Sequence, residues 1–169
     1  MKTLHFLAAM LVVGAPLAAY AAEPAEAWAV IDGKGQIANT PFGPFDILAT
    51  TEQTNGAVGI FTTTEPAGAV GPSHAHTGEV ETFYVLTGKY RFVTGSKTIE
   101  GGPGTTVVIP KNVSNQYSNI GTEEGHLLVW EMPGGFEHFF MEIDSTHADT
   151  PAKIADLEKK HGIVNSSLK

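Results

Sequence analysis

The sequence has no cysteine among its 169 residues and only one arginine, Arg91. Without cysteine the protein can form neither a disulfide bond nor a thiolate metal or catalytic site. Its 18 acidic residues outnumber the 10 lysines and arginines, and the formal net charge is −8. Because such a surface repels phosphate backbones and anionic lipids, we expect no nucleic-acid partner.

Motifs for nucleophilic catalysis and phosphate binding are missing as well. The chain contains no Gly-x-Ser-x-Gly sequence. Its glycine-rich segment, residues 101–104, lies between two predicted strands and does not open a helix, so it is not a phosphate loop.

Residues 1–22 are typical of a secretory signal peptide. Lys2 is followed by a mostly apolar run over residues 4–17, and residues 19–21 (Ala-Tyr-Ala) form a small-x-small cleavage site. The apolar run is too short for a membrane span. We therefore expect a periplasmic or secreted protein that has no membrane contact after cleavage.

Short strands separated by turn signals dominate the rest of the chain. They are predicted at residues 28–31, 45–51, 57–64, 82–86, 89–94, 97–100, 105–109, 115–120 and 126–132. This spacing indicates an antiparallel sandwich or barrel. We divide the chain into a leader with N-terminal strands (23–56), a core (57–142) and a helical tail (143–169).

The C-terminal part changes to a helical period. Phe136, Phe139, Phe140 and Ile143 follow the i, i+3, i+4, i+7 spacing of an amphipathic helix. A second helix is expected to begin after Thr150 and to end before Gly162. Both helices are expected to pack on the outside of the barrel.

His74, His76 and Glu81 form the candidate metal site. Side chains two apart on a strand point to the same face, so the two imidazoles can share one space. If the strand at 82–86 pairs with the histidine strand after a tight reversal, Glu81 reaches that space too. Two imidazoles and one carboxylate form a facial triad with open coordination positions.

The spacing around these residues resembles a known motif. Residues 68–88 read G-x5-H-x-H-x4-E-x6-G, which is similar to the first motif of the cupin superfamily. The second motif, G-x5-P-x-G-x2-H-x3-N, is matched at residues 104–119 except that Asn112 replaces its central glycine and Asn115 its ligand histidine. The resemblance covers residues 57–140 and implies an all-β fold: a single-domain cupin β-barrel (jelly roll, or double-stranded β-helix) with a short C-terminal helical extension.

The tail at residues 133–140, Pro-Gly-Gly-Phe-Glu-His-Phe-Phe, resembles that of quercetin dioxygenase-like cupins. This resemblance implies an oxidoreductase that binds one divalent transition metal, with iron, manganese, nickel and zinc all possible. It assigns the metal to His74, His76 and Glu81, with Asn115 beside it. It also implies a homodimer.

Two of these positions leave alternatives open. Asn115 could coordinate weakly, hold a metal-bound water or hydrogen-bond the substrate, because a carboxamide is a poorer ligand than imidazole for these metals. Glu79 competes with Glu81 as third ligand, and could instead serve as a general base.

Five further residues are candidates for a substrate pocket, namely Phe83, Val85, Phe92, Asn119 and His126, and Tyr117 is a candidate catalytic residue beside them. Tyr117 lies two residues from both Asn115 and Asn119, so the three should share a face, and Tyr117 could donate a catalytic hydrogen bond. His126 could supply the missing imidazole from a neighbouring strand. Apolar lining is expected from Phe83, Val85 and Phe92.

The leading hypothesis is a metal-dependent, dioxygenase-like enzyme for a small organic substrate, which could be aromatic or enolic. One alternative is a non-catalytic small-molecule-binding protein. Another is a metal-dependent lyase or isomerase, because fold and metal site do not specify the reaction.

Overall fold

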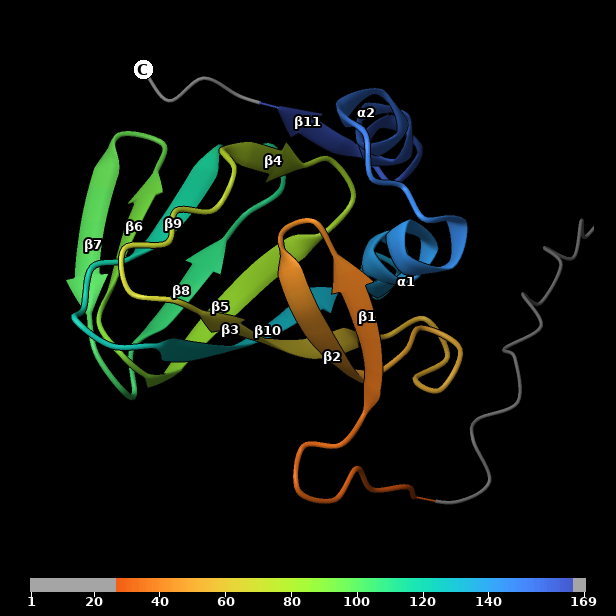
Figure 1. Ribbon diagram of the computed structural model, residues 1–169, viewed down its shortest axis with the longest axis horizontal. Coiled ribbons are helices and arrows are strands. Elements are labelled where there is room, and N and C mark those ends of the chain that lie inside the picture. Colours follow the sequence, from red (N-terminus) through yellow and green to blue (C-terminus); the bar gives the residue numbers. More distant parts are fainter. Residues whose placement is uncertain (1–26, 166–169) are drawn as a thin grey trace, which may run out of the picture.

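Two antiparallel sheets face each other and enclose the core in the computed structural model, which describes residues 27–165 (Figure 1). The signal peptide predicted at residues 1–22 lies outside the described residues. The first sheet has the order β1 (Gln36–Thr40), β2 (Gly43–Ala49), β3 (Gly59–Glu65), β10 (Gly125–Met132), β5 (Val80–Thr87), β8 (Thr106–Ile109). The second has the order β11 (Ile163–Asn165), β4 (His74–His76), β9 (Asn115–Asn119), β6 (Tyr90–Thr94), β7 (Lys97–Gly101). This confirms the predicted jelly-roll barrel.

Alternating burial along the strands explains why these segments form a barrel. In β10, Leu127, Val129 and Glu131 are buried while their neighbours are more exposed. Inward-facing aromatic residues such as Phe83 and Phe92 fill the space between the sheets. Each such side chain contributes about 1.5–3 kcal/mol through burial.

Strands β4 and β5 do not pair, so the predicted hairpin is wrong. Strand β4 lies between β11 and β9, whereas β5 lies between β10 and β8 in the other sheet. The turn at residues 77–79 carries the chain from one sheet to the other. Glu81 therefore approaches the histidines across the barrel interior, a route that sequence spacing does not distinguish from a hairpin.

The N-terminal strand lies later in the chain than predicted. Residues 28–31 have no regular structure, and Trp28 and Ile31 are exposed. Strand β1 forms instead at Gln36–Thr40, where it pairs with β2. Apolar residues at 28–31 thus have no sheet to join among the described residues.

Helix α1 (Glu137–Thr146) is part of the core rather than an outer cover. Phe139, Phe140 and Ile143 are buried, and the Phe140 ring stacks on Phe45 with 3.7 Å between ring centroids. The helix closes one end of the barrel (Figure 1). The predicted amphipathic face is correct, but it packs inward.

Helix α2 (Pro151–Lys160) lies outside, as predicted, with no buried residue. Thr150 Oγ1 caps it by accepting a hydrogen bond from the Lys153 backbone N–H at 3.4 Å. After Gly162 the chain forms strand β11, where the sequence predicts only the helical tail. Strand β11 pairs with β4 and so borders both histidines.

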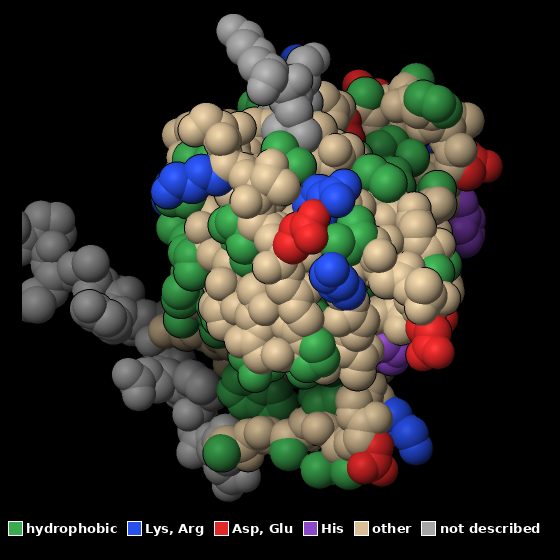
Figure 2. Space-filling view, turned by 90° about the vertical axis from the view of Figure 1, so that its left-hand side faces the viewer, with side chains coloured by type: hydrophobic (Ala, Val, Ile, Leu, Met, Phe, Trp, Pro, Cys, Tyr) green, Lys and Arg blue, Asp and Glu red, His purple; other side chains and the backbone are tan. Residues whose placement is uncertain are grey.

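The face of the molecule formed by β6 and β7 carries charges of both signs. Figure 2 shows basic and acidic side chains side by side on the face formed by β6 and β7. Here Glu100 pairs with Arg91 at 2.8 Å and with Lys89 at 3.9 Å. Within residues 27–165 no helix has the length and apolar character needed to cross a membrane.

Candidate metal centre

Strand β4 presents both imidazoles to the barrel interior. His74 and His76 are buried, and their Nε2 atoms lie 3.1 Å apart. The strand is held on both sides, because His74 is opposite Asn115 of β9 and Asn165 of β11. The period of two along a strand thus brings the two rings together as predicted.

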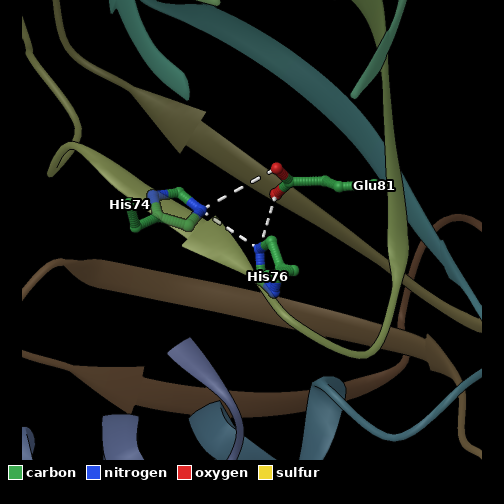
Figure 3. Close-up of side chains that lie close together, drawn as sticks. All are labelled: His74, His76 and Glu81. Carbon is green, nitrogen blue, oxygen red and sulfur yellow. Dashed lines mark hydrogen bonds and ion pairs between the residues drawn. The ribbon is translucent and has the colours of Figure 1, made fainter. Parts of the chain in front are cut away.

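Glu81, near the start of β5, completes the group. Its Oε2 lies 3.8 Å from Nε2 of His74, and its Oε1 lies 3.6 Å from Nε2 of His76. Figure 3 shows the three side chains converging. The structure therefore brings together the three residues that the motif predicts, as a group able to hold a metal ion.

The backbone sets the tautomer of one imidazole. Nδ1 of His74 lies 3.1 Å from the Pro72 carbonyl oxygen. Because a carbonyl only accepts, Nδ1 carries the proton and the Nε2 lone pair is left to face the group. A metal-binding histidine is commonly oriented by such a contact.

The donor set fits a divalent transition metal. Two nitrogens bound to one ion at about 2.1 Å lie roughly 3.0–3.4 Å apart at octahedral or tetrahedral angles. The separation of 3.1 Å between the two Nε2 atoms falls in this range. Imidazole and carboxylate together suit iron, manganese, nickel or zinc, so this donor set does not select one.

The local field favours a positive charge. Burial alone would raise the pKa of Glu81, but the adjacent His74 and His76 hold it at about 2. Burial lowers the pKa of His74, yet contact with Glu81 raises it above its usual value overall. An ionised carboxylate buried beside two imidazoles is the electrostatic setting of a cation site.

Asn115 lies at the edge of the group and contacts its carboxylate. Its Nδ2 donates a hydrogen bond to Glu81 Oε2 at 3.0 Å, and the side chain is 1 % exposed. With the amide so oriented, Asn115 holds Glu81 in place. Its Oδ1 has no hydrogen-bond partner among the described residues.

A small apolar cavity adjoins the histidine–glutamate group. Its volume is about 60 Å³, enough for a few water molecules. His74 and Glu81 form part of its wall, and Tyr117 and Glu158 are the other main polar contributors. The aromatic lining comprises Phe42, Phe45, Phe61, Phe83, Phe136, Phe139 and Phe140.

Comparisons with known proteins agree with this architecture. A family model described as a cupin domain matches residues 61–131. Residues 61–131 thus form a cupin domain. No curated protein sequence is significantly similar to this cupin.

Solved structures resemble this cupin in fold. KdgF from Halomonas sp. is 17% identical with a TM-score of 0.59, over 67% of this chain and 99% of that one. An RmlC-like cupin from Shewanella frigidimarina is 17% identical with a TM-score of 0.56, over 67% and 96%. A predicted oxalate decarboxylase from Thermotoga maritima is 23% identical with a TM-score of 0.50, over 53% and 79%. At these identities the likeness shows the fold alone.

Asn112, at the position of a motif glycine, adopts a left-handed backbone conformation. Its φ is +62°, in the left-handed region. Asparagine tolerates this region better than most residues, so the turn survives the replacement. The Asn112 backbone N–H donates to the His76 carbonyl oxygen at 2.7 Å, which ties the turn to β4.

Glu79 lies on the other edge of the His76 ring. Its Oε2 is 3.8 Å from Nδ1 of His76, whereas Glu81 and His74 face Nε2. Glu79 does not line the cavity. The structure thus places it where it can orient His76, not where it would meet a molecule in the cavity as a general base.

Tyr117 lines the cavity with its hydroxyl already engaged. The hydroxyl donates to Glu65 Oε1 at 2.8 Å. Burial raises the pKa of Tyr117 well above its usual value, and Glu65 raises it further. The residue therefore stays protonated, and its donor is occupied in the absence of substrate.

Of the other residues predicted to form the pocket, one lines the cavity and three are buried away from it. Phe83 lines the cavity, while Val85 and Phe92 are fully buried in the core. Asn119 is structural, because its Nδ2 lies within hydrogen-bond distance of the carbonyl oxygens of Glu65, Pro66 and Glu123.

His126 does not meet the metal group in this structure. Its side chain is 47 % exposed, and its Nε2 lies 3.5 Å from Glu124 at the surface. The alternation of β10 points Leu127 inward and therefore His126 outward. The missing imidazole is not supplied from this strand.

Glu131 is a residue that the sequence reading missed. It is fully buried on β10, directly opposite Glu81 of β5, and its Oε1 lies 3.8 Å from Nε2 of His76. The available signal was its phase: Glu131 follows Leu127 and Val129 at a spacing of two, on the inward face. A carboxylate in that phase is unusual enough to mark a site.

Proposed function

We propose that this cupin is a metal-dependent enzyme acting on a small, uncharged aromatic or enolic molecule, with His74, His76 and Glu81 holding one divalent transition metal. The observation that carries the proposal is the placement of His74 and Glu81 in the wall of an aromatic cavity. A metal held there would supply Lewis-acid chemistry by polarising a substrate oxygen.

The chain's own residues would then bind and orient the substrate. Aromatic rings such as Phe83 and Phe136 offer flat apolar surfaces and exclude water. Phe136 also packs edge-on against His76, with 4.4 Å between ring centroids, and so limits the ring's rotation. Proximity and fixed orientation of the reactants are the main catalytic contributions expected from this arrangement.

Charge argues against an anionic substrate. The only ionisable groups among the residues that line the cavity are His74, Glu81, Tyr117 and Glu158, and none is a lysine or arginine. A dianion such as oxalate would meet Glu81 and Glu158 without a compensating cation beyond the metal. We therefore do not propose oxalate as the substrate, although the fold is similar to that of a predicted oxalate decarboxylase.

The dioxygenase reaction is proposed because the tail at residues 133–140 resembles that of quercetin dioxygenase-like cupins. A metal-dependent lyase or isomerase would need the same ligands and no oxygen. A purely binding role is favoured by one observation: Asn115 occupies the position of the motif's fourth ligand and engages Glu81 instead.

Export and dimer formation remain proposals as well. The pattern of residues 1–22 supports a periplasmic or secreted location. An outward apolar face on the first sheet supports a homodimer, since Leu86, Val108 and Met132 are each more than 40 % exposed there.

The proposal is tested by ligand binding and oxygen uptake on untagged, metal-loaded protein. Isothermal titration with catechol and with oxalate should give binding for catechol and none for oxalate. An oxygen electrode then separates a dioxygenase from a lyase or a binding protein. Preferential binding of oxalate, or identical binding by the His74→Ala/His76→Ala variant, would overturn it.

A further inference from the structure

Glu131 adds a second buried carboxylate to the surroundings of His76. Nε2 of His76 faces three potential ligand atoms: His74 Nε2 at 3.1 Å, Glu81 Oε1 at 3.6 Å and Glu131 Oε1 at 3.8 Å. The contact with Glu131 is as long as the one between His74 and Glu81. Glu131 therefore borders the same imidazole nitrogen as the predicted ligands.

Both oxygens of Glu131 lack a hydrogen-bond partner among residues 27–165. The residue is 0 % exposed. A buried carboxylate without a partner is costly unless a cation or a protein donor compensates it. By contrast, the equally buried Glu137 accepts hydrogen bonds from the backbone N–H groups of Thr51 and Gly135.

The charges around Glu131 are all of one sign. The charged groups that act on it are Glu81, Glu79 and Glu137. No lysine or arginine contributes. One divalent cation would balance two carboxylates, and two neutral imidazoles would add no charge.

We propose that Glu131 is an additional protein ligand of the metal held by His74, His76 and Glu81. This inference rests on the proposed metal centre. It gives the centre two imidazoles and two carboxylates, in place of the three imidazoles and one carboxylate that the motif describes. A harder, more oxygen-rich ligand set shifts preference toward iron or manganese relative to copper or zinc.

Glu79 and Glu131 form a second group with His76, in which one possible ligand atom from each residue lies within 4.8 Å of the others, but Glu79 contacts a different nitrogen of the ring. It lies against Nδ1 of His76, on the ring edge opposite the nitrogen that Glu131 borders. Asn115 is not an equivalent either, since its Nδ2 donates to Glu81. Glu131 is thus the remaining buried oxygen donor beside Nε2 of His76 within the described residues.

The test compares wild type with Glu131→Gln, which keeps the side-chain shape and removes the charge. Mn²⁺ and Co²⁺ affinities are measured by titration against a chelating dye, and the visible spectrum of the Co²⁺ protein reports its coordination. Loss of a ligand should weaken Mn²⁺ binding by about tenfold or more and change the Co²⁺ spectrum. Glu65→Gln, a buried carboxylate bonded to Tyr117, is the matched control and should bind metal like wild type.

Unchanged affinity and an unchanged Co²⁺ spectrum in Glu131→Gln would overturn the inference while leaving the three-residue centre intact. Absence of metal binding by wild type would overturn the proposed metal centre itself, and the inference with it. If Glu131→Gln does not fold, Glu131→Asp is used, which keeps the charge and shortens the side chain. A ligand role then requires a changed Co²⁺ spectrum, and an identical one would contradict it.

Discussion

Asn115 donates a hydrogen bond to Glu81 across the barrel interior, from Nδ2 to Oε2 at 3.0 Å. The two residues belong to opposite sheets, β9 and β5. The contact fixes the carboxylate that faces both imidazoles. Asn115 stands where the motif has a ligand histidine, and in this protein it orients Glu81 instead.

Replacing Asn115 with alanine should therefore weaken metal binding without removing it. The variant loses the hydrogen bond that orients Glu81, and loss of such an outer contact commonly costs about 10–100-fold in metal affinity. Asn115→His, which adds an imidazole, should strengthen binding instead. Titration against a chelating dye measures both.

Gln116→Ala controls for disturbance of β9. Its Nε2 donates to the Gly71 carbonyl oxygen, away from the metal group. We expect its metal affinity to match wild type. Equal affinities in Asn115→Ala and wild type would show that Asn115 does not position Glu81.

Metal binding should stabilise the fold. A ligand at a hundred times its dissociation constant adds about 2.7 kcal/mol to the free energy of unfolding. For a chain of this length that raises Tm by about 5–10 °C. Differential scanning calorimetry with and without Mn²⁺ measures the shift. His74→Ala/His76→Ala should show none, and an equal shift in that variant would place the ion elsewhere.

Asn119 should matter for stability and not for metal. Its side chain is 1 % exposed and bridges the carbonyl oxygens of Glu65 and Glu123, while its Oδ1 accepts from the Gly121 N–H. Asn119→Ala leaves these groups unpaired, and we expect a loss of about 2–4 kcal/mol in urea unfolding. Metal affinity measured below the transition should be unchanged. A stable variant with weakened metal binding would contradict this assignment.

Removing the Tyr117 hydroxyl should destabilise the protein in a pH-dependent way. Burial raises the pKa of Glu65, and hydrogen bonds from Tyr117 and Thr63 oppose that rise. Tyr117→Phe removes the stronger donor, so we expect a loss of about 1–3 kcal/mol at pH 7.

The direction in which this loss of stability changes with pH follows from the linkage between protonation and folding. Because the folded pKa of Glu65 is raised, its own contribution favours folding below the unfolded pKa and is lost as pH rises through the folded value. Tyr117→Phe raises the folded pKa further, so its deficit relative to wild type should shrink as pH falls toward 4. Urea unfolding at several pH values measures it. A deficit that grows at low pH would contradict the role of the Tyr117 hydrogen bond.

The residues of the metal group were predictable because their geometry is local. His74 and His76 share a face through the strand period, and a short turn limits how far Glu81 can lie. The pairing of strands was not predictable from that spacing, since a hairpin and a crossing between sheets both bring Glu81 close. Long-range register, here β4 with β9 and β11, decided it.

Helix α2 and strand β11 show the same contrast between local signals, which are predictable, and long-range pairing, which is not. Thr150 and Pro151 mark its start through capping chemistry, and the structure agrees. Strand β11 was missed because Ile163–Asn165 is too short to show a period, and it is a strand only because β4 is there to pair with. Glu131 was missed for a related reason: its burial depends on β5 and β3 on either side.

The decisive measurement for the centre formed by His74, His76 and Glu81 is the metal content of the protein. Elemental mass spectrometry of the untagged protein, beside His74→Ala/His76→Ala, gives the ions bound per chain. We expect about one divalent transition metal per chain in wild type and its loss in the variant. Less than about a tenth of an ion per chain after reconstitution with iron, manganese, nickel or zinc would contradict it.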